Sequence, residues 1–169
     1  GLVVEPSRRD TAPAIMLACA YLAFSRNVAL NDTVVVMPID SYADQGFYSS
    51  VIELDRAVQA GFADLMLLGI QPDGASTKYG YIVPQEPSGK YPSSCLRVAA
   101  FKEKPSRVVA QELVGGGAFW NCGVFAFRLG FGLNALARYG SFASYEEVRR
   151  NYDSLPRASF DYEVVEKCD

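Results

Sequence analysis

Three charged residues stand where predicted strands end, and their types suit phosphate and sugar chemistry. Asp40 comes directly after the apolar run 33–37, and Glu103 and Lys104 follow the alternating segment 97–102. In open α/β sheets, ligands bind beyond the carboxyl ends of the strands. A carboxylate there suits Mg²⁺, whereas a carboxylate beside an ammonium suits a phosphorylated sugar. Considered singly, an Asp after a strand is more often a turn residue, and a Glu-Lys pair more often a solvated turn.

Three other positions carry weaker signals. Gly80 interrupts a predicted strand between two tyrosines, which favours either close approach of a ligand or a β-bulge. Asn121 interrupts the apolar strand 119–127, and its amide could bond to its own backbone or to a ligand. Asp161 lies in the first turn of a predicted helix, where a carboxylate is commonly a cap favoured by the helix dipole. It would become a metal ligand only if the fold brings it to Asp40.

The composition excludes several kinds of chemistry. The 169 residues include no histidine, which removes Ser-His-Asp and Cys-His triads and imidazole bases. The four cysteines are scattered without CxxC spacing, so we expect no zinc site, no disulfide framework and a reduced cytoplasm. A net charge of −3 without a basic run argues against nucleic acid. The apolar segment 12–24 is too short to span a membrane and lacks a signal peptide's basic flank.

Apolar segments of two periodicities alternate along the chain, which is typical of a doubly wound α/β sheet. The length of the chain fits one domain over residues 1–169. We predict a helix over 12–26 that Thr11 caps. The other helices are expected at 46–61, 106–114, 131–139, 144–151 and 161–167, and the strands at 2–4, 33–37, 65–70, 79–83, 97–102 and 119–127.

Six segments occur in one order from Glu5 to Lys167: EPSRRDTAPAI, VVVMPID, YGYI, FKEKP, FWNCGVFAF and SFDYEVVEK. In that order they resemble the bacterial mannose-1-phosphate guanylyltransferases, or GDP-mannose pyrophosphorylases. The resemblance implies a Rossmann-like, doubly wound mixed sheet of the sugar nucleotidyltransferase type. It also implies that mannose 1-phosphate and GTP react to give GDP-mannose and pyrophosphate, for polysaccharide biosynthesis. The partners would be these small molecules, with no nucleic acid or membrane, and a homo-oligomer is left open.

The resemblance also assigns roles to individual residues. Glu5 and the segment 9–13, with Arg9, Thr11 and Pro13, match the family's guanine-recognition region. This suits the chemistry, because one carboxylate can accept both the N1–H and the 2-amino group of guanine. The remaining roles are Asp40 and Asp161 as ligands of Mg²⁺, Lys104 on the sugar phosphate, and Gly80, Glu103 and Asn121 on the mannose ring, with Asp40 and Lys104 as the catalytic pair.

The sequence departs from the family pattern at several positions. Ser41 replaces the histidine after the metal-binding Asp, Asp10 replaces an asparagine, and Cys122 replaces a serine. The resemblance implies that the family's glycine-rich triphosphate loop would lie before Gly1, outside this sequence. We therefore expect a fragment that is incomplete at its N-terminus and weakly active or inactive alone.

Two other functions stay open from the sequence. One is a nucleotidyltransferase for another sugar 1-phosphate or nucleotide, although the Glu5 carboxylate would repel a uracil or thymine carbonyl. The other is a catalytically silent module that binds a sugar nucleotide. The charged and amide residues at predicted strand ends weigh against the silent module.

Overall fold

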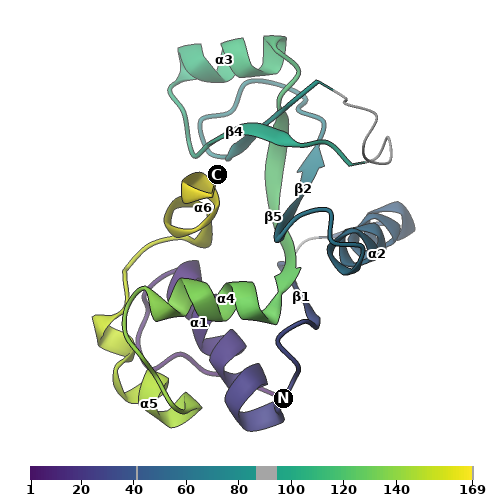
Figure 1. Cartoon of the computed structure of the whole chain (residues 1–169). Helices are drawn as coiled ribbons and strands as arrows, with labels where there is room; N and C mark the ends of the chain where they lie inside the picture. The colour runs from purple at the N-terminus through teal and green to yellow at the C-terminus, as the bar shows by residue number, and fades with distance from the viewer. Residues whose placement is uncertain (41, 87–94, 169) are drawn as a thin grey trace. The chain divides into compact units, whose positions relative to one another are not determined.

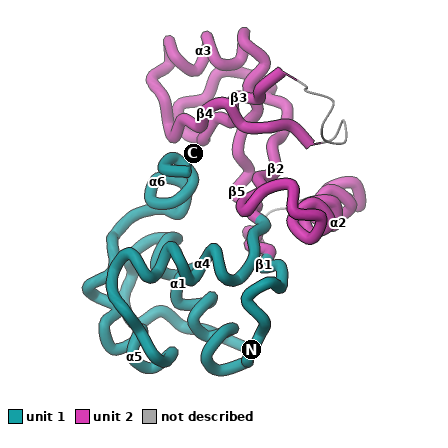
Figure 2. The backbone as a smooth tube through the Cα atoms, in the orientation of Figure 1, with its two compact units in different colours: residues 1–34, 126–169 teal, residues 35–125 magenta. Residues whose placement is uncertain are grey.

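The computed structural model describes residues 1–40, 42–86 and 95–168. By its internal contacts the chain divides into two compact units (Figure 2). Unit 1 comprises residues 1–34 and 126–169, and unit 2 comprises residues 35–125. The single domain over residues 1–169 stays a prediction.

The elements alternate as the sequence predicts, and the chain has a mixed α/β fold (Figure 1). The described strands are hydrogen-bonded in the order β1-β5-β3-β4, and β2 also pairs with β5. The strands are β1 (Thr33–Val36), β2 (Leu65–Ile70), β3 (Tyr81–Pro84), β4 (Val98–Lys102) and β5 (Phe119–Arg128). The helices are α1 (Thr11–Ala20), continued by a π-helical turn (Tyr21–Ser25), α2 (Gln45–Gln59), α3 (Arg107–Gly115), α4 (Leu129–Ala137), α5 (Tyr145–Arg150) and α6 (Phe160–Glu163), with 3₁₀ turns at Tyr152–Ser154 and Val165–Lys167.

In unit 2, strand β3 is antiparallel to both of its neighbours. Tyr81 lies opposite Lys102 of β4 on one side and opposite Trp120 of β5 on the other. Tyr81 is fully buried and forms a small core with Ala110 of α3. With this register, the end of β4 lies on one side of the start of β3 and the start of β5 lies on the other.

In unit 1, helix α1 is apolar on all sides, as expected for a helix enclosed by protein. It packs against α4, α5 and α6 (Figure 1). Phe127 stacks on Phe160 with ring centroids 5.7 Å apart, which joins the end of β5 to α6. A Cβ atom added to Gly132 of α4 would lie 2.5 Å from Sγ of Cys19, so α1 and α4 meet at a residue without a side chain.

Two sequence-based expectations for the N-terminal segment are wrong. The predicted strand at 2–4 does not form, and residues 1–10 contain neither helix nor strand. Leu2 and Val4 are exposed rather than paired in a sheet. The cap of α1 is Asp10 and not Thr11, because Asp10 Oδ1 accepts the Thr11 N–H at 2.8 Å. Thr11 is a cap-forming residue type that stands one position inside the helix.

The last predicted helix is also shorter than expected. Helix α6 ends at Glu163, and the 3₁₀ turn Val165–Lys167 follows it in place of a continuous helix over 161–167. Within residues 1–40, 42–86 and 95–168, no helix combines the length and the apolar character that crossing a bilayer requires.

Candidate sugar and nucleotide sites

The predicted sugar-binding residues of unit 2 come together where β3, β4 and β5 meet. The Asn121 N–H donates to the Gly80 carbonyl at 2.8 Å. Gly80 is buried, and a Cβ atom there would lie 2.7 Å from Glu103 Oε2 and 2.7 Å from Cζ of Phe101. The Glu103 carboxylate therefore lies directly against the Gly80 backbone, and only glycine permits that approach.

Glu103 and Lys104 form an ion pair just beyond the end of β4. Lys104 Nζ lies 2.8 Å from Glu103 Oε1. The Glu103 side chain is 14 % exposed and that of Lys104 is 60 % exposed, so the ammonium reaches solvent while the carboxylate is mostly covered. Lys104 has a left-handed backbone, with φ 44°, and its N–H donates to the Tyr79 carbonyl at 3.2 Å. The turn thus holds a carboxylate that can accept hydroxyl groups beside an ammonium that can contact a phosphate.

The side chain of Asn121 makes a hydrogen bond to the backbone of its own strand. Its Oδ1 accepts the N–H of Gly123 at 3.2 Å. Gly123 has φ 72°, a left-handed conformation that favours glycine. The break in the apolar strand thus has a local structural cause. A contact between Asn121, which is buried, and a sugar hydroxyl stays a prediction.

Aromatic and thiol side chains flank this cluster. The rings of Tyr79 and Trp120 are 4.9 Å apart, and Tyr79 is 46 % exposed. The sequence placed both aromatics next to Gly80 and Asn121 but gave no sign that they touch. The Cys122 Sγ–H donates to the Leu68 carbonyl at 3.2 Å, and burial raises the pKa of this thiol. Cys122 therefore ties β5 to β2 as a neutral thiol.

The two predicted metal ligands belong to different units. Asp40 belongs to unit 2 and is exposed in the loop after β1, and Ser41 beside it lies outside the described residues. Asp161 is in the first turn of α6 in unit 1. Ser159 supplies the cap of α6, since its Oγ accepts the Tyr162 N–H at 3.3 Å, so Asp161 is not needed as the cap.

The pairing of Asp40 and Asp161 on a cation stays a prediction. No three His, Cys, Asp or Glu side chains among the described residues are grouped so that they could hold a metal ion.

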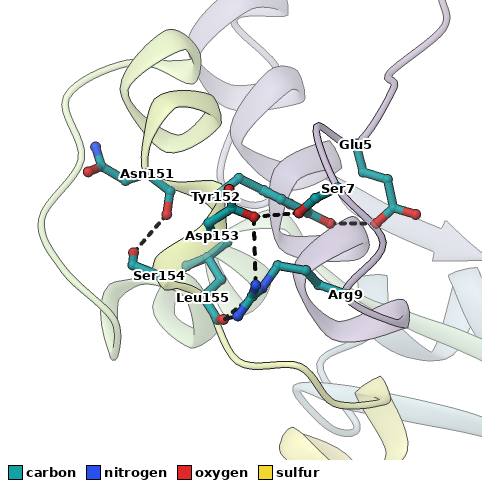
Figure 3. Close-up of polar contacts among 8 residues, drawn as sticks. All are labelled: Glu5, Ser7, Arg9, Asn151, Tyr152, Asp153, Ser154 and Leu155. Carbon is teal, nitrogen blue, oxygen red and sulfur yellow. Dashed lines mark hydrogen bonds and ion pairs between the residues drawn. The ribbon is translucent and has the colours of Figure 1, made fainter.

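In unit 1, two of the predicted nucleotide-binding residues, Glu5 and Arg9, lie against the turn after α5 (Figure 3). The Tyr152 hydroxyl donates to Glu5 Oε2 at 2.7 Å. Nε and Nη2 of Arg9 donate to the Leu155 carbonyl at 3.0 and 2.8 Å, and Nη1 is 3.6 Å from Asp153 Oδ1. The segment that begins at Glu5 is therefore fixed to the 3₁₀ turn Tyr152–Ser154 and to the residue after it.

Thr11 and Pro13 have structural roles in the same unit. Thr11 Oγ1 accepts the Phe160 N–H at 2.8 Å, which connects α1 to α6. Pro13 is buried in the first turn of α1, where its missing N–H costs nothing. Arg9 and Thr11 thus hold backbone groups in place, and their contact with a nucleotide stays a prediction.

No local sequence pattern pointed to Tyr152. It is 1 % exposed, and it contacts Glu5 across 147 positions of the chain. Burial raises the pKa of its hydroxyl, and the hydrogen bond to Glu5 and the negative charge of that carboxylate raise it further. Tyr152 therefore stays a hydrogen-bond donor at neutral pH.

Comparison with known proteins identifies a family. The sequence profile of the family described as nucleotidyl transferase matches residues 1–152. The alginate biosynthesis protein AlgA of Pseudomonas putida KT2440 is 31% identical over 187 residues, covering 99% of this chain and 37% of that protein. The mannose-1-phosphate guanylyltransferase of Escherichia coli K12 is 36% identical over 143 residues, covering 82% of this chain and 29% of that protein. The chain thus spans about a third of the length of the curated relatives it matches.

Solved structures give the same picture of the fold. The crystal structure of mannose-1-phosphate geranyltransferase from Thermus thermophilus is 34% identical with a TM-score of 0.74, covering 99% of this chain and 50% of that one. The mannose-6-phosphate isomerase from Helicobacter pylori is 25% identical with a TM-score of 0.72, covering 99% of this chain and 68% of that one.

Proposed function

Because this chain belongs to the nucleotidyl transferase family, we propose that it is part of a mannose-1-phosphate guanylyltransferase. The reaction joins mannose 1-phosphate to the guanylyl group of GTP, and it gives GDP-mannose and pyrophosphate. The observation that carries the proposal is the cluster of Gly80, Glu103 and Lys104 in unit 2. A covered carboxylate and an exposed ammonium, 2.8 Å apart, match the hydroxyl groups and the phosphate of one sugar phosphate.

The proposed reaction needs no nucleophile from the protein. A phosphate oxygen of mannose 1-phosphate attacks the α-phosphorus of GTP, and the bond from that phosphorus to the bridging oxygen breaks as pyrophosphate leaves. The protein then acts by positioning its substrates and by neutralising charge. Lys104 would hold the attacking phosphate, and Glu103 would orient the ring through its hydroxyls. The lack of histidine agrees with this chemistry.

Asp40 of unit 2 and Asp161 of unit 1 are each a candidate ligand of Mg²⁺ in the proposed enzyme. Both offer carboxylate oxygens, the ligands that Mg²⁺ takes together with substrate phosphates, so their donor chemistry fits this ion. When bound, Mg²⁺ neutralises charge on the phosphates.

The base of GTP would be recognised in unit 1. Glu5 is half-buried and accepts one hydrogen bond from Tyr152, out of about four that a carboxylate can accept. The guanine N1–H and 2-amino group are two adjacent donors, and they complement the remaining acceptor positions.

Calorimetric titration of this chain with GDP-mannose and Mg²⁺ tests the proposal, with UDP-glucose as the comparison. We expect saturable binding of GDP-mannose and no binding of UDP-glucose. Lys104→Ala and Asn121→Ala should each weaken the binding of GDP-mannose by about tenfold or more, because each variant loses hydrogen bonds to the ligand. Val108→Ala is the matched control, because Val108 is exposed on α3 of the same unit. Preferential binding of UDP-glucose would assign a different sugar nucleotide, and binding of neither compound would contradict the proposed site.

A further inference from the structure

We infer that Tyr152 is a positioning residue that orients the Glu5 carboxylate for recognition of guanine. The inference rests on the proposed function and adds to it a residue that supports base specificity through Glu5. It starts from one contact, the hydrogen bond from the Tyr152 hydroxyl to Glu5 Oε2 at 2.7 Å. Tyr152 is almost fully buried and Glu5 is half-buried, so a fixed donor meets a carboxylate that a ligand can still reach.

The chain segment at Glu5 does not depend on Tyr152 to stay in place. Arg9 makes two hydrogen bonds to the Leu155 carbonyl, and the Ser7 hydroxyl donates to Asp153 (Figure 3). These contacts already attach the backbone of the segment to the turn after α5. The bond from Tyr152 therefore acts on the orientation of one side chain, the Glu5 carboxylate.

That orientation matters because guanine presents its two donors in a fixed geometry. A glutamate side chain has three rotatable bonds, and a free one would lose their freedom when it binds the base. Tyr152 occupies one position on Oε2 and leaves Oε1 and a second position on Oε2 for the N1–H and the 2-amino group. A preorganised carboxylate binds more tightly, since less freedom is lost on association.

The test is the preference of this chain for GDP over inosine diphosphate, which lacks the 2-amino group, measured by calorimetry without Mg²⁺. We expect the unaltered chain to prefer GDP by about tenfold, the effect of one hydrogen bond to a charged group. In Tyr152→Phe we expect the preference to fall about fivefold. In Glu5→Gln the preference should nearly vanish, and adding Tyr152→Phe should change it no further, because Tyr152 acts through Glu5.

Ser154→Ala is the matched control. Ser154 belongs to the same 3₁₀ turn and donates to the Asn151 carbonyl at 2.7 Å, without contacting Glu5 (Figure 3). This variant should keep the preference for GDP. An unchanged preference in Tyr152→Phe would overturn the role of Tyr152 and leave the proposed function standing. Equal binding of GDP and inosine diphosphate by the unaltered chain, or binding of neither, would overturn both.

Discussion

At the scale of single residues, the backbone at Lys104 is strained where the side chain is proposed to act. Its φ of 44° puts a non-glycine residue in the left-handed region, which costs an L-residue roughly 1–2 kcal/mol. The ion pair with Glu103 offsets at most part of this cost, because the Lys104 side chain is 60 % exposed and its charge is screened by solvent. Strain of this kind persists only where the surrounding structure enforces it, and such residues are concentrated at functional sites. In this conformation Lys104 Nζ lies 2.8 Å from Glu103 Oε1.

Comparing Lys104→Gly with Lys104→Ala separates strain from function. Both variants remove the ammonium, so both should bind mannose 1-phosphate about tenfold more weakly. Only glycine relieves the left-handed backbone, so Lys104→Gly should be more stable than Lys104→Ala by about 1 kcal/mol. Urea denaturation measures the difference in the free energy of unfolding. Equal stability of the two variants would show that the backbone is not strained at this position.

At the scale of elements, α1 is the centre of unit 1. Its apolar residues are covered by α4, α5 and α6, and its contact with α4 is close enough to require glycine. A Cβ atom on Gly132 would lie 2.5 Å from Sγ of Cys19 and 3.0 Å from Cε2 of Phe127. In packing of this density, even a small increase in side-chain volume affects the stability of the fold.

We predict that Gly132→Ala lowers the stability of the chain by about 1–3 kcal/mol through overpacking. Helix propensity alone predicts the opposite sign, because alanine is favoured over glycine inside a helix by about 1 kcal/mol. In a Cys19→Ala background the cost should shrink, since the closest clashing atom is gone.

Gly115→Ala in α3 is the control for this prediction. Apart from the neighbouring residues and the backbone of α3 itself, no atom of the described residues lies within 4 Å of a Cβ placed there, so we expect that variant to be at least as stable as the unaltered chain. Thermal unfolding of the four variants measures the effect. Additive effects of Gly132→Ala and Cys19→Ala would contradict the proposed contact.

A second element-scale prediction concerns Thr11, which holds the start of α6. Thr11→Val removes the acceptor of the Phe160 N–H and should cost about 1 kcal/mol, because a partly buried donor loses its partner. Thr11→Ser keeps the hydroxyl and should stay within about 0.5 kcal/mol of the unaltered chain. Urea denaturation distinguishes the two variants. A loss in Thr11→Ser without a loss in Thr11→Val would point to the methyl group, which valine keeps and serine lacks, instead of the hydrogen bond.

The elements were predictable because their signals are local. The apolar runs before Pro38 and before Gln71 predicted β1 and β2, and the cap-forming residue Ser106 predicted the start of α3. The start of α1 was misassigned by one residue, because Asp10 and Thr11 are both cap-forming types and only the backbone decides between them. The prediction of a strand at 2–4 was wrong because a strand needs a neighbouring strand to pair with, and local sequence does not show whether such a neighbour is present.

The candidate site was predictable in its parts but not in its contacts. Spacing placed Glu103 and Lys104 at the end of a strand, and the structure pairs them there. The approach of Glu103 to Gly80 and the bond from Tyr152 to Glu5 join residues far apart in the chain. A single sequence does not encode such pairings in any local pattern.

At the scale of the whole molecule, the two units carry different halves of the proposed chemistry. Unit 1 contains the predicted base-recognition residues and Asp161, and unit 2 contains the predicted sugar-binding residues and Asp40. The ionisable groups with the most strongly raised pKa values also gather in unit 1. Burial raises the pKa of Cys19 to about 12, and burial and the hydrogen bond to Glu163 raise that of Tyr139 to about 12. The pKa of Tyr152 is raised as well.

These shifts predict that stability falls with pH above about pH 9. In the folded chain the three groups keep their protons, whereas in the unfolded chain a cysteine releases its proton near pH 8.5 and a tyrosine near pH 10. The unfolded state then binds fewer protons than the folded state, so the free energy of unfolding decreases as pH rises. Between pH 9 and 10.5, Cys19 alone should account for roughly 2 kcal/mol.

The pH at which stability begins to fall separates the contribution of Cys19 from that of Tyr139. The measurement is the urea midpoint of unfolding at half-unit steps of pH from 8 to 10.5. Cys19→Ala should flatten the profile from about pH 9, and Tyr139→Phe only from about pH 10, because the unfolded-state pKa values differ in that order. Tyr48→Phe is the control, since Tyr48 is half exposed on α2 of unit 2, and its profile should match that of the unaltered chain. A midpoint that stays constant up to pH 10.5 would mean that water reaches Cys19 in the folded state and that α1 is packed less tightly against α4 than the structure has it.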